Sequence, residues 1–229
     1  IKMIVGWVGA IIELFLYFSL SSYFREKYNY QDMNTLTYYW LSFTVLTGIW
    51  ETTYLLRRND VIKISTDFIK NKQHAWTNRY PVSMVVPKNF SKLFYAEYGA
   101  WADREYMTDN NYWSAFVEGS HCLFCAGFSL VALLYHYHGD QNKFYIAIAT
   151  AMGNQFMNSV LYLAEYTIQM KNPNSSNYVS DKFPAGVMLI KRPFMWINIL
   201  WIMMPAYIIY EYLNDNYLSV GIGIFSKIF

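Results

Sequence analysis

The chain has 229 residues, of which 55% are hydrophobic, 20% aromatic and only 15% charged. Soluble domains carry roughly 25% charged residues, so this composition excludes a disordered chain, a coiled coil and most nucleic-acid-binding proteins. The net charge of +2 is too small to indicate a polyanionic partner. The two cysteines, Cys122 and Cys125, lie in an apolar stretch and do not indicate a disulfide framework.

Five stretches are long and apolar enough to cross a bilayer, which requires about 17–25 residues. Because lipid offers no partner to backbone polar groups, each stretch is expected to be a helix. We therefore predict an all-α membrane protein with one multi-pass domain over residues 1–229. A soluble all-α protein with buried helices is the alternative. The expected spans are residues 4–23, 36–56, 112–137, 144–169 and 194–213.

The connections between these spans differ in character. Residues 57–111 form a long polar segment, in which we expect a short interfacial helix around residues 90–98. Residues 171–192 contain Asn-Pro-Asn-Ser-Ser-Asn, which is typical of a loop. Residues 217–229 are apolar but short, and are expected to lie along the surface.

The distribution of basic residues predicts the topology. Fourteen of the 18 Lys and Arg residues fall on the side of the N-terminus and the two longer loops. That side is expected to face the cytosol or the mitochondrial matrix. The chain begins at Ile1 rather than Met, which suggests processing and would suit mitochondrial import. The mitochondrial inner membrane is therefore the expected location, with the endoplasmic reticulum as the alternative.

Several polar side chains fall within the expected spans. Ionisable groups in a membrane are costly and usually face the interior of the helix bundle. Glu118 and His121 are three residues apart and share a helix face. Glu13 and Glu51 lie near span ends and could be interfacial, while amides often only join neighbouring helices. The full set is Glu13, Glu51, Glu118, His121, Asn154, Gln155, Asn158, Tyr162, Glu165, Asn198 and Trp201.

The Glu-x-x-His spacing of Glu118 and His121 could suggest a carboxylate-bridged metal site. Such sites need a second Glu-x-x-His, and the chain has none. The Cys-x-x-Cys of Cys122 and Cys125 is better explained by small residues at a helix-packing face. We expect neither a metal nor another cofactor.

From about residue 40 to residue 213, the polar pattern resembles the emopamil-binding protein family, also called the EXPERA domain. The fifth span resembles the family's Asn-x-x-Trp-x-x-x-Pro, and the fourth its Gly-Gln…Leu-Tyr. The third span matches its membrane glutamate, and the preceding segment its Glu-Tyr…Asp-Ser-Arg-Tyr…Asp. The matching residues are Asn198, Trp201, Pro205, Gly153, Gln155, Leu161, Tyr162, Glu118, Gly127, Glu97, Tyr98, Asp103, Arg104, Tyr106 and Asp109.

The second span departs from the family pattern. Gly48 stands where the family has a His, and Thr52 stands where it has a Glu. Glu51 is one residue early, which on a regular helix turns its side chain by about 100°. Either Glu51 points elsewhere, or the helix is locally irregular.

The resemblance implies the chemistry of sterol Δ8–Δ7 isomerases, which move a double bond by protonating one carbon and deprotonating another. Glu118 would be one acid/base group, Trp201 the aromatic face beside a carbocation, and Asn198 an orienting group. In an active protein, Glu51 and His121 would replace the missing groups. A lipid or sterol would contact Glu118, Asn158, Tyr162, Asn198 and Trp201.

Two hypotheses follow. The first is a non-catalytic accessory subunit of a larger membrane assembly, such as a respiratory-type complex, that contacts lipid or sterol and other membrane subunits. Gly48 and Thr52 favour it. The second is a working sterol isomerase. A channel or transporter is a third possibility, but the chain shows no inverted repeat or charged pore ring. Under the family resemblance, Glu118, Asn198 and Trp201 should converge on one interior cavity.

Overall fold

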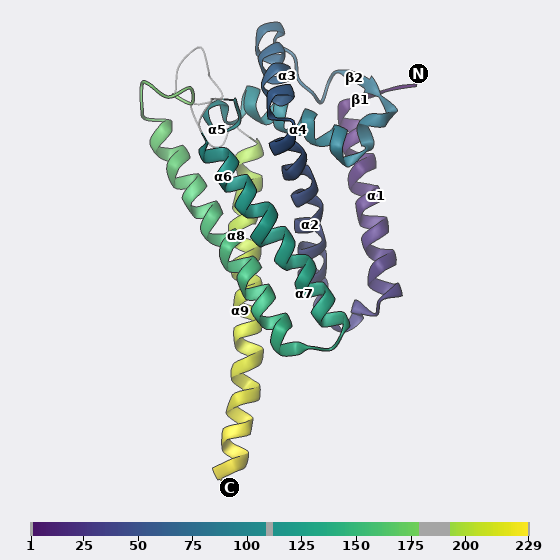
Figure 1. Ribbon diagram of the computed structural model, residues 1–229, viewed down its shortest axis with the longest axis vertical. Helices are drawn as coiled ribbons and strands as arrows, with labels where there is room; N and C mark the ends of the chain where they lie inside the picture. Colours follow the sequence, from purple (N-terminus) through teal and green to yellow (C-terminus); the bar gives the residue numbers. More distant parts are fainter. Residues whose placement is uncertain (1, 109–111, 179–192, 229) are drawn as a thin grey trace.

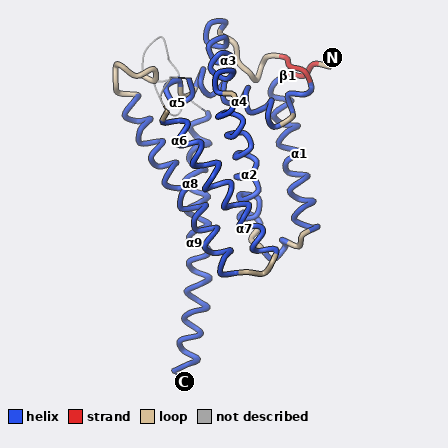
Figure 2. The backbone as a smooth tube through the Cα atoms, viewed as in Figure 1, coloured by secondary structure: helices blue, strands red, loops and turns tan. Residues whose placement is uncertain are grey.

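The computed structural model describes residues 2–108, 112–178 and 193–228, with the backbone alone for residues 193–195 and 214–228. The described chain is mostly helical (Figure 2), which confirms the all-α class. A short antiparallel strand pair, β1 (Met3–Val5) and β2 (Arg79–Pro81), joins the N-terminus to the middle of the chain, with Ile4 opposite Tyr80.

Five long helical rods run side by side and build the bundle (Figure 1). The third rod is continuous but contains a π-helical turn, η3, between its two α-helical parts. Each rod has at least 22 residues, about 33 Å at 1.5 Å per residue, against about 30 Å of hydrocarbon in a bilayer. The rods are α1 (Gly6–Lys27), α2 (Thr35–Leu56), α6–η3–α7 (Trp113–Ser120, His121–Ala126, Gly127–Tyr137), α8 (Gln141–Gln169) and α9 (Pro193–Ile228).

Two of these rods, Gly6–Lys27 and Trp113–Tyr137, are long and apolar enough to cross a membrane by length and hydropathy. The expected span at residues 36–56 coincides with α2, and that at 144–169 lies within α8. Among the described residues, length and hydropathy do not by themselves identify α2, α8 or α9 as membrane spans, so the five-span topology stays a prediction.

Residues 57–111 are more structured than the polar connection that we expected. The helix expected at residues 90–98 is the longer α4 (Pro87–Trp101), and α3 (Arg58–Asn71) packs against it. The reason is a buried stripe on α3, where Val61, Ser65 and Phe68 recur at helical spacing. The 3₁₀ turn η2 (Val82–Val85) and the short helix α5 (Arg104–Thr108) flank α4.

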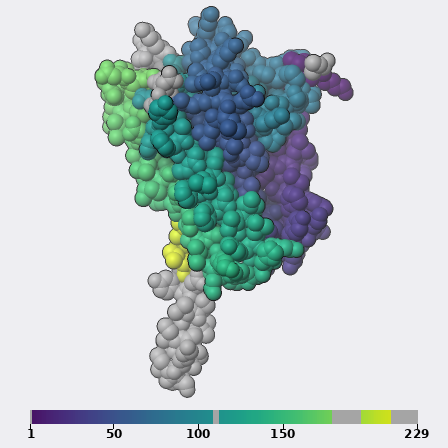
Figure 3. All heavy atoms as spheres, in the orientation of Figure 1, coloured from purple at the N-terminus to yellow at the C-terminus, as the bar shows by residue number. Residues whose placement is uncertain are grey.

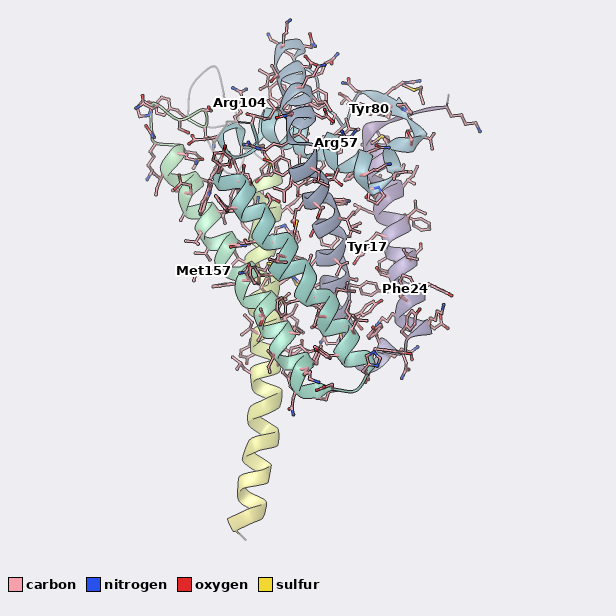
Figure 4. All side chains as sticks on the ribbon, in the orientation of Figure 1. Tyr17, Phe24, Arg57, Tyr80, Arg104 and Met157 are labelled. Atoms are coloured by element: carbon pink, nitrogen blue, oxygen red, sulfur yellow. The ribbon has the colours of Figure 1, made fainter. Side chains whose placement is uncertain are left out.

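Basic residues gather at the end of the bundle that carries the N-terminus, where α3 holds Arg58, Lys63 and Lys70 (Figure 1). Arg57 and Arg104 lie at the end that carries the N-terminus, and Phe24 lies toward the other end (Figure 4). Turns with the 3₁₀ segment η1 (Tyr30–Asp32) and Gly139 close the second end. The tail expected along the surface instead continues α9 through Ile228 (Figure 1). Most of the expected loop at residues 171–192 lies outside the described residues.

Candidate functional site

A chain of hydrogen bonds crosses the interior of the bundle between α2, η3 and α8. The indole Nε1–H of Trp40 donates to Oε1 of Gln155 at 2.7 Å. Nε2 of Gln155 lies 3.1 Å from Nε2 of His121. The other ring nitrogen of His121, Nδ1, lies 2.6 Å from the Glu51 carboxylate. Glu51, His121 and Gln155 are all buried.

The direction of this chain fixes the tautomer of His121. An indole N–H can only donate, so Oε1 of Gln155 must face Trp40. The amide nitrogen of Gln155 therefore faces His121 and donates to its Nε2. Nε2 must then accept, so the ring proton sits on Nδ1 and is donated to Glu51. The pair is thus a neutral imidazole that donates to a carboxylate, and the Glu51 carboxylate is the member that can accept a further proton.

Trp201 on α9 forms an aromatic wall beside this pair. Its ring centroid lies 5.2 Å from that of His121, in an edge-to-face arrangement. Trp40 lies 4.8 Å from it, and Phe43 stacks on it at 5.8 Å. Aromatic faces attract cations, so this wall would suit a positively charged group beside the pair.

The close approach of α2 to η3 positions His121 opposite Glu51. A Cβ built on Gly48 would lie 2.3 Å from the Cβ of Ala126, so no larger residue fits there without movement. The family's His therefore has no room at position 48. The local irregularity considered for the second span is not found, because α2 is a regular helix; the π-helical turn is η3, in the facing segment.

Glu118 belongs to a second polar network and has other partners than His121. It accepts hydrogen bonds from Tyr106 at 2.8 Å and from Tyr95 at 3.3 Å. The ring of Tyr106 packs edge-to-face on Tyr162, with centroids 4.9 Å apart. Glu118 and His121, three residues apart in the sequence, thus have two separate sets of hydrogen-bond partners.

Asn198 joins the second network at the end of the bundle near α4. Its amide nitrogen donates to the Tyr98 hydroxyl at 3.0 Å. Tyr98 also forms a short hydrogen bond with the Tyr162 hydroxyl, which donates to Asp103 at 2.9 Å. The amide of Asn177 donates to Asp103 at 2.6 Å. This network ties α4, α8 and α9 together.

The remaining expected residues occupy two further places. Asn158 donates to Ser120 at 2.8 Å and to Asn154 at 3.1 Å, which is the helix-joining role foreseen for amides. Glu13 is buried rather than interfacial, and its Oε1 accepts from the indole of Trp50 at 2.9 Å. Among the described residues, no group of three or more His, Cys, Asp or Glu is arranged to hold a metal ion.

Glu118, Asn198 and Trp201 all contact interior groups, and the partners that the structure describes for each of them differ. Trp201 lies on the Glu51–His121 pair, whereas Glu118 and Asn198 lie in the tyrosine network. The structure has a pocket away from these three residues, between α8 and α9, which is lined by Met152 and Ile208 among others. The geometry therefore divides the expected single site into two neighbouring polar networks.

Comparisons with protein-family models, with curated proteins and with solved structures find no match to this chain. The resemblance to the EXPERA family thus rests on the residues quoted above, and membership of that family is a proposal.

Proposed function

We propose that this protein is a multi-pass membrane protein whose five long rods all cross the bilayer. The support is an outward apolar surface on every rod. One large apolar side chain from each is more than half exposed: Phe15 on α1, Leu56 on α2, Phe116 on α6, Ile146 on α8 and Met203 on α9. Figure 3 shows that α6, α7 and α8 form one continuous face of the molecule.

The interior supports the same proposal, because it is rich in polar groups. Thr44, Glu51, His121 and Gln155 are each at most 9% exposed and bond to one another or to neighbouring helices. A protein folded in water has the reverse arrangement, and large exposed apolar patches there promote association. In a bilayer, interior polar groups and outward apolar groups are the stable solution.

We further propose that the protein acts as a non-catalytic accessory subunit of a larger membrane assembly and contacts lipid or sterol. The observation that carries this proposal is the close contact of Gly48 with Ala126, which leaves no space for the family's His. The other expected groups already have protein partners: Glu118 has two tyrosines, and Asn198 has Tyr98. A respiratory-type assembly of the mitochondrial inner membrane is the proposed host, with the basic end of the bundle facing the matrix.

A sterol double-bond isomerase is the second candidate. The Glu51–His121 pair at 2.6 Å and the Trp201 ring beside it favour this function. They supply a carboxylate base held by an imidazole, and an aromatic face of the kind that carbocation chemistry needs.

One experiment separates the two candidates. The protein is extracted from its native membrane in a mild detergent, sized, and analysed by mass spectrometry together with what co-migrates. An accessory subunit should travel with a large complex of other membrane proteins. Migration as a monomer or dimer, together with isomerisation of a Δ8 sterol that is lost in Glu51→Gln, would refute the accessory role.

A further inference from the structure

An apolar groove of about 170 Å³ lies on the outer surface between α8 and α9, toward the end of the bundle opposite the N-terminus. Its floor is made by Met152 and Ile208, which are almost fully buried. Two tyrosines, Tyr145 and Tyr212, stand at one end with ring centroids 5.8 Å apart. Ala149 is the small, exposed residue on the α8 side.

The groove opens onto the surface that we propose to face lipid. Its neighbours Ile146 and Leu213 are 67% and 53% exposed. Tyr145 lies four residues after the start of α8 at Gln141, about 6 Å along the helix axis. Tyrosines at this depth match the aromatic belt at a membrane interface. The groove therefore runs from the interface into the hydrocarbon region.

The charges around the tyrosine end restrict the headgroup of an occupant. Lys143 is already paired with Asp140 at 2.6 Å. Glu211, next to Tyr212 in sequence, carries a carboxylate whose Oε2 accepts from Thr37 at 3.0 Å. On α8 and α9 themselves, the described charged side chains near these tyrosines are thus a neutral pair and one acidic group. An anionic phospholipid would meet a carboxylate there, whereas a headgroup without net charge would not be repelled.

We propose that this groove holds one acyl chain of a zwitterionic phospholipid, which stays with the protein as a bound lipid. The proposal rests on the proposed membrane location. A flexible hydrocarbon chain can follow a shallow, open groove between two helices, and burying it on an apolar floor is favourable. This moves the lipid contact from the interior residues expected from the sequence to the outer surface of α8 and α9.

The test compares two bulky replacements at exposed alanines. Ala149→Phe fills the groove, whereas Ala206→Phe adds the same bulk to an exposed position of α9 outside the groove lining. Both proteins are purified in mild detergent with phosphatidylcholine, phosphatidylglycerol and a sterol at equal concentrations. Native mass spectrometry then measures which lipid stays bound per protein, and circular dichroism checks that both variants fold.

We expect near-stoichiometric phosphatidylcholine on the wild type and on Ala206→Phe, and a several-fold loss on Ala149→Phe. Equal retention by both variants, or preferential retention of phosphatidylglycerol or sterol, would overturn the proposal. The size of the native assembly is measured on the same samples. A wild-type protein that migrates alone would refute the accessory role while the lipid ratios still decide the groove.

Discussion

Replacement of Gly48 by Ala should destabilise the protein, because it adds a methyl group where α2 meets η3. The new Cβ would lie 2.3 Å from the Cβ of Ala126, whereas carbon atoms pack best at about 3.5–4.0 Å. The two segments must therefore separate by more than about 1 Å. The Cβ of Ala126 is fixed to the backbone and cannot rotate away.

The magnitude follows from two opposing terms. Overpacking of a tight contact costs about 1–3 kcal/mol. Replacing glycine by alanine inside a helix stabilises the helix by up to about 1 kcal/mol. We expect a net loss of about 1–2 kcal/mol in the free energy of unfolding. The separation should also lengthen the short Glu51–His121 contact, because η3 carries His121.

The chain provides its own reporter for this measurement. Its two cysteines both lie in η3, Cys125 fully buried and Cys122 partly so. A thiol-reactive dye that fluoresces on reaction therefore follows thermal unfolding in detergent. Gly153→Ala is the matched control, because nothing lies within 4 Å of a Cβ there, and it should be neutral or stabilising.

The exchange variant Gly48→Ala with Ala126→Gly should recover most of the lost stability, because it moves the methyl group across the contact without adding volume. Unfolding of Gly48→Ala at the wild-type temperature would refute the reasoning. So would an exchange variant that is no more stable than Gly48→Ala.

The other predictions concern buried polar pairs and one exposed pair. His121→Leu leaves Glu51 buried without its imidazole and should lower the free energy of unfolding by about 3–5 kcal/mol. The double variant Glu51→Leu with His121→Leu should lose less stability than the two single variants together. Additive losses in this double-mutant cycle would contradict the pairing. Glu13→Gln keeps an acceptor for the indole of Trp50 and should leave stability unchanged, while Glu13→Leu strands that N–H and should cost about 1–3 kcal/mol in the same thermal assay. The hydrogen bond from His136 lowers the pKa of Asp32, so this contact stabilises the fold above the unfolded pKa of about 3.9 and is lost as the pH falls through the lower folded value. Asp32→Asn should therefore weaken the dependence of unfolding on pH below about 4, by a small amount because Asp32 is 68% exposed; an unchanged pH profile would exclude the contribution.

The long helices could be predicted from the sequence because apolar length is a local property. α2 begins one residue before its expected span and ends at the same residue. The structure of residues 57–111 was harder to predict, because α3 is polar on average. Only the spacing of Val61, Ser65 and Phe68 indicates a helix there. The stability of α3 comes from packing on α4, and the composition of one segment gives no information about its packing partner.

The sequence predicted which residues belong to the site better than it predicted which of them contact one another. Trp40 was missed, although Trp40, Thr44 and Glu51 follow one helix face at spacings of four and seven residues. That spacing could have assigned all three to one polar stripe. Tyr98, Tyr106 and Asp103 were noted only through the family resemblance, because they fall in a segment that we expected to be a connection.

The pairing of His121 with Glu51 could not be predicted, because it depends on contacts among α2, η3 and α8, which are far apart in the sequence. On a regular helix, Glu118 and His121 would share a face and compete for one proton. The π-helical turn begins at His121, and Gln155 on α8 then occupies Nε2 of the ring. Because Trp40 fixes the orientation of that amide, the proton on His121 can only be directed at Glu51. The direction of this proton is therefore set by an indole that belongs to no catalytic motif, together with Thr44, whose hydroxyl accepts from the same Gln155 amide nitrogen at 3.3 Å.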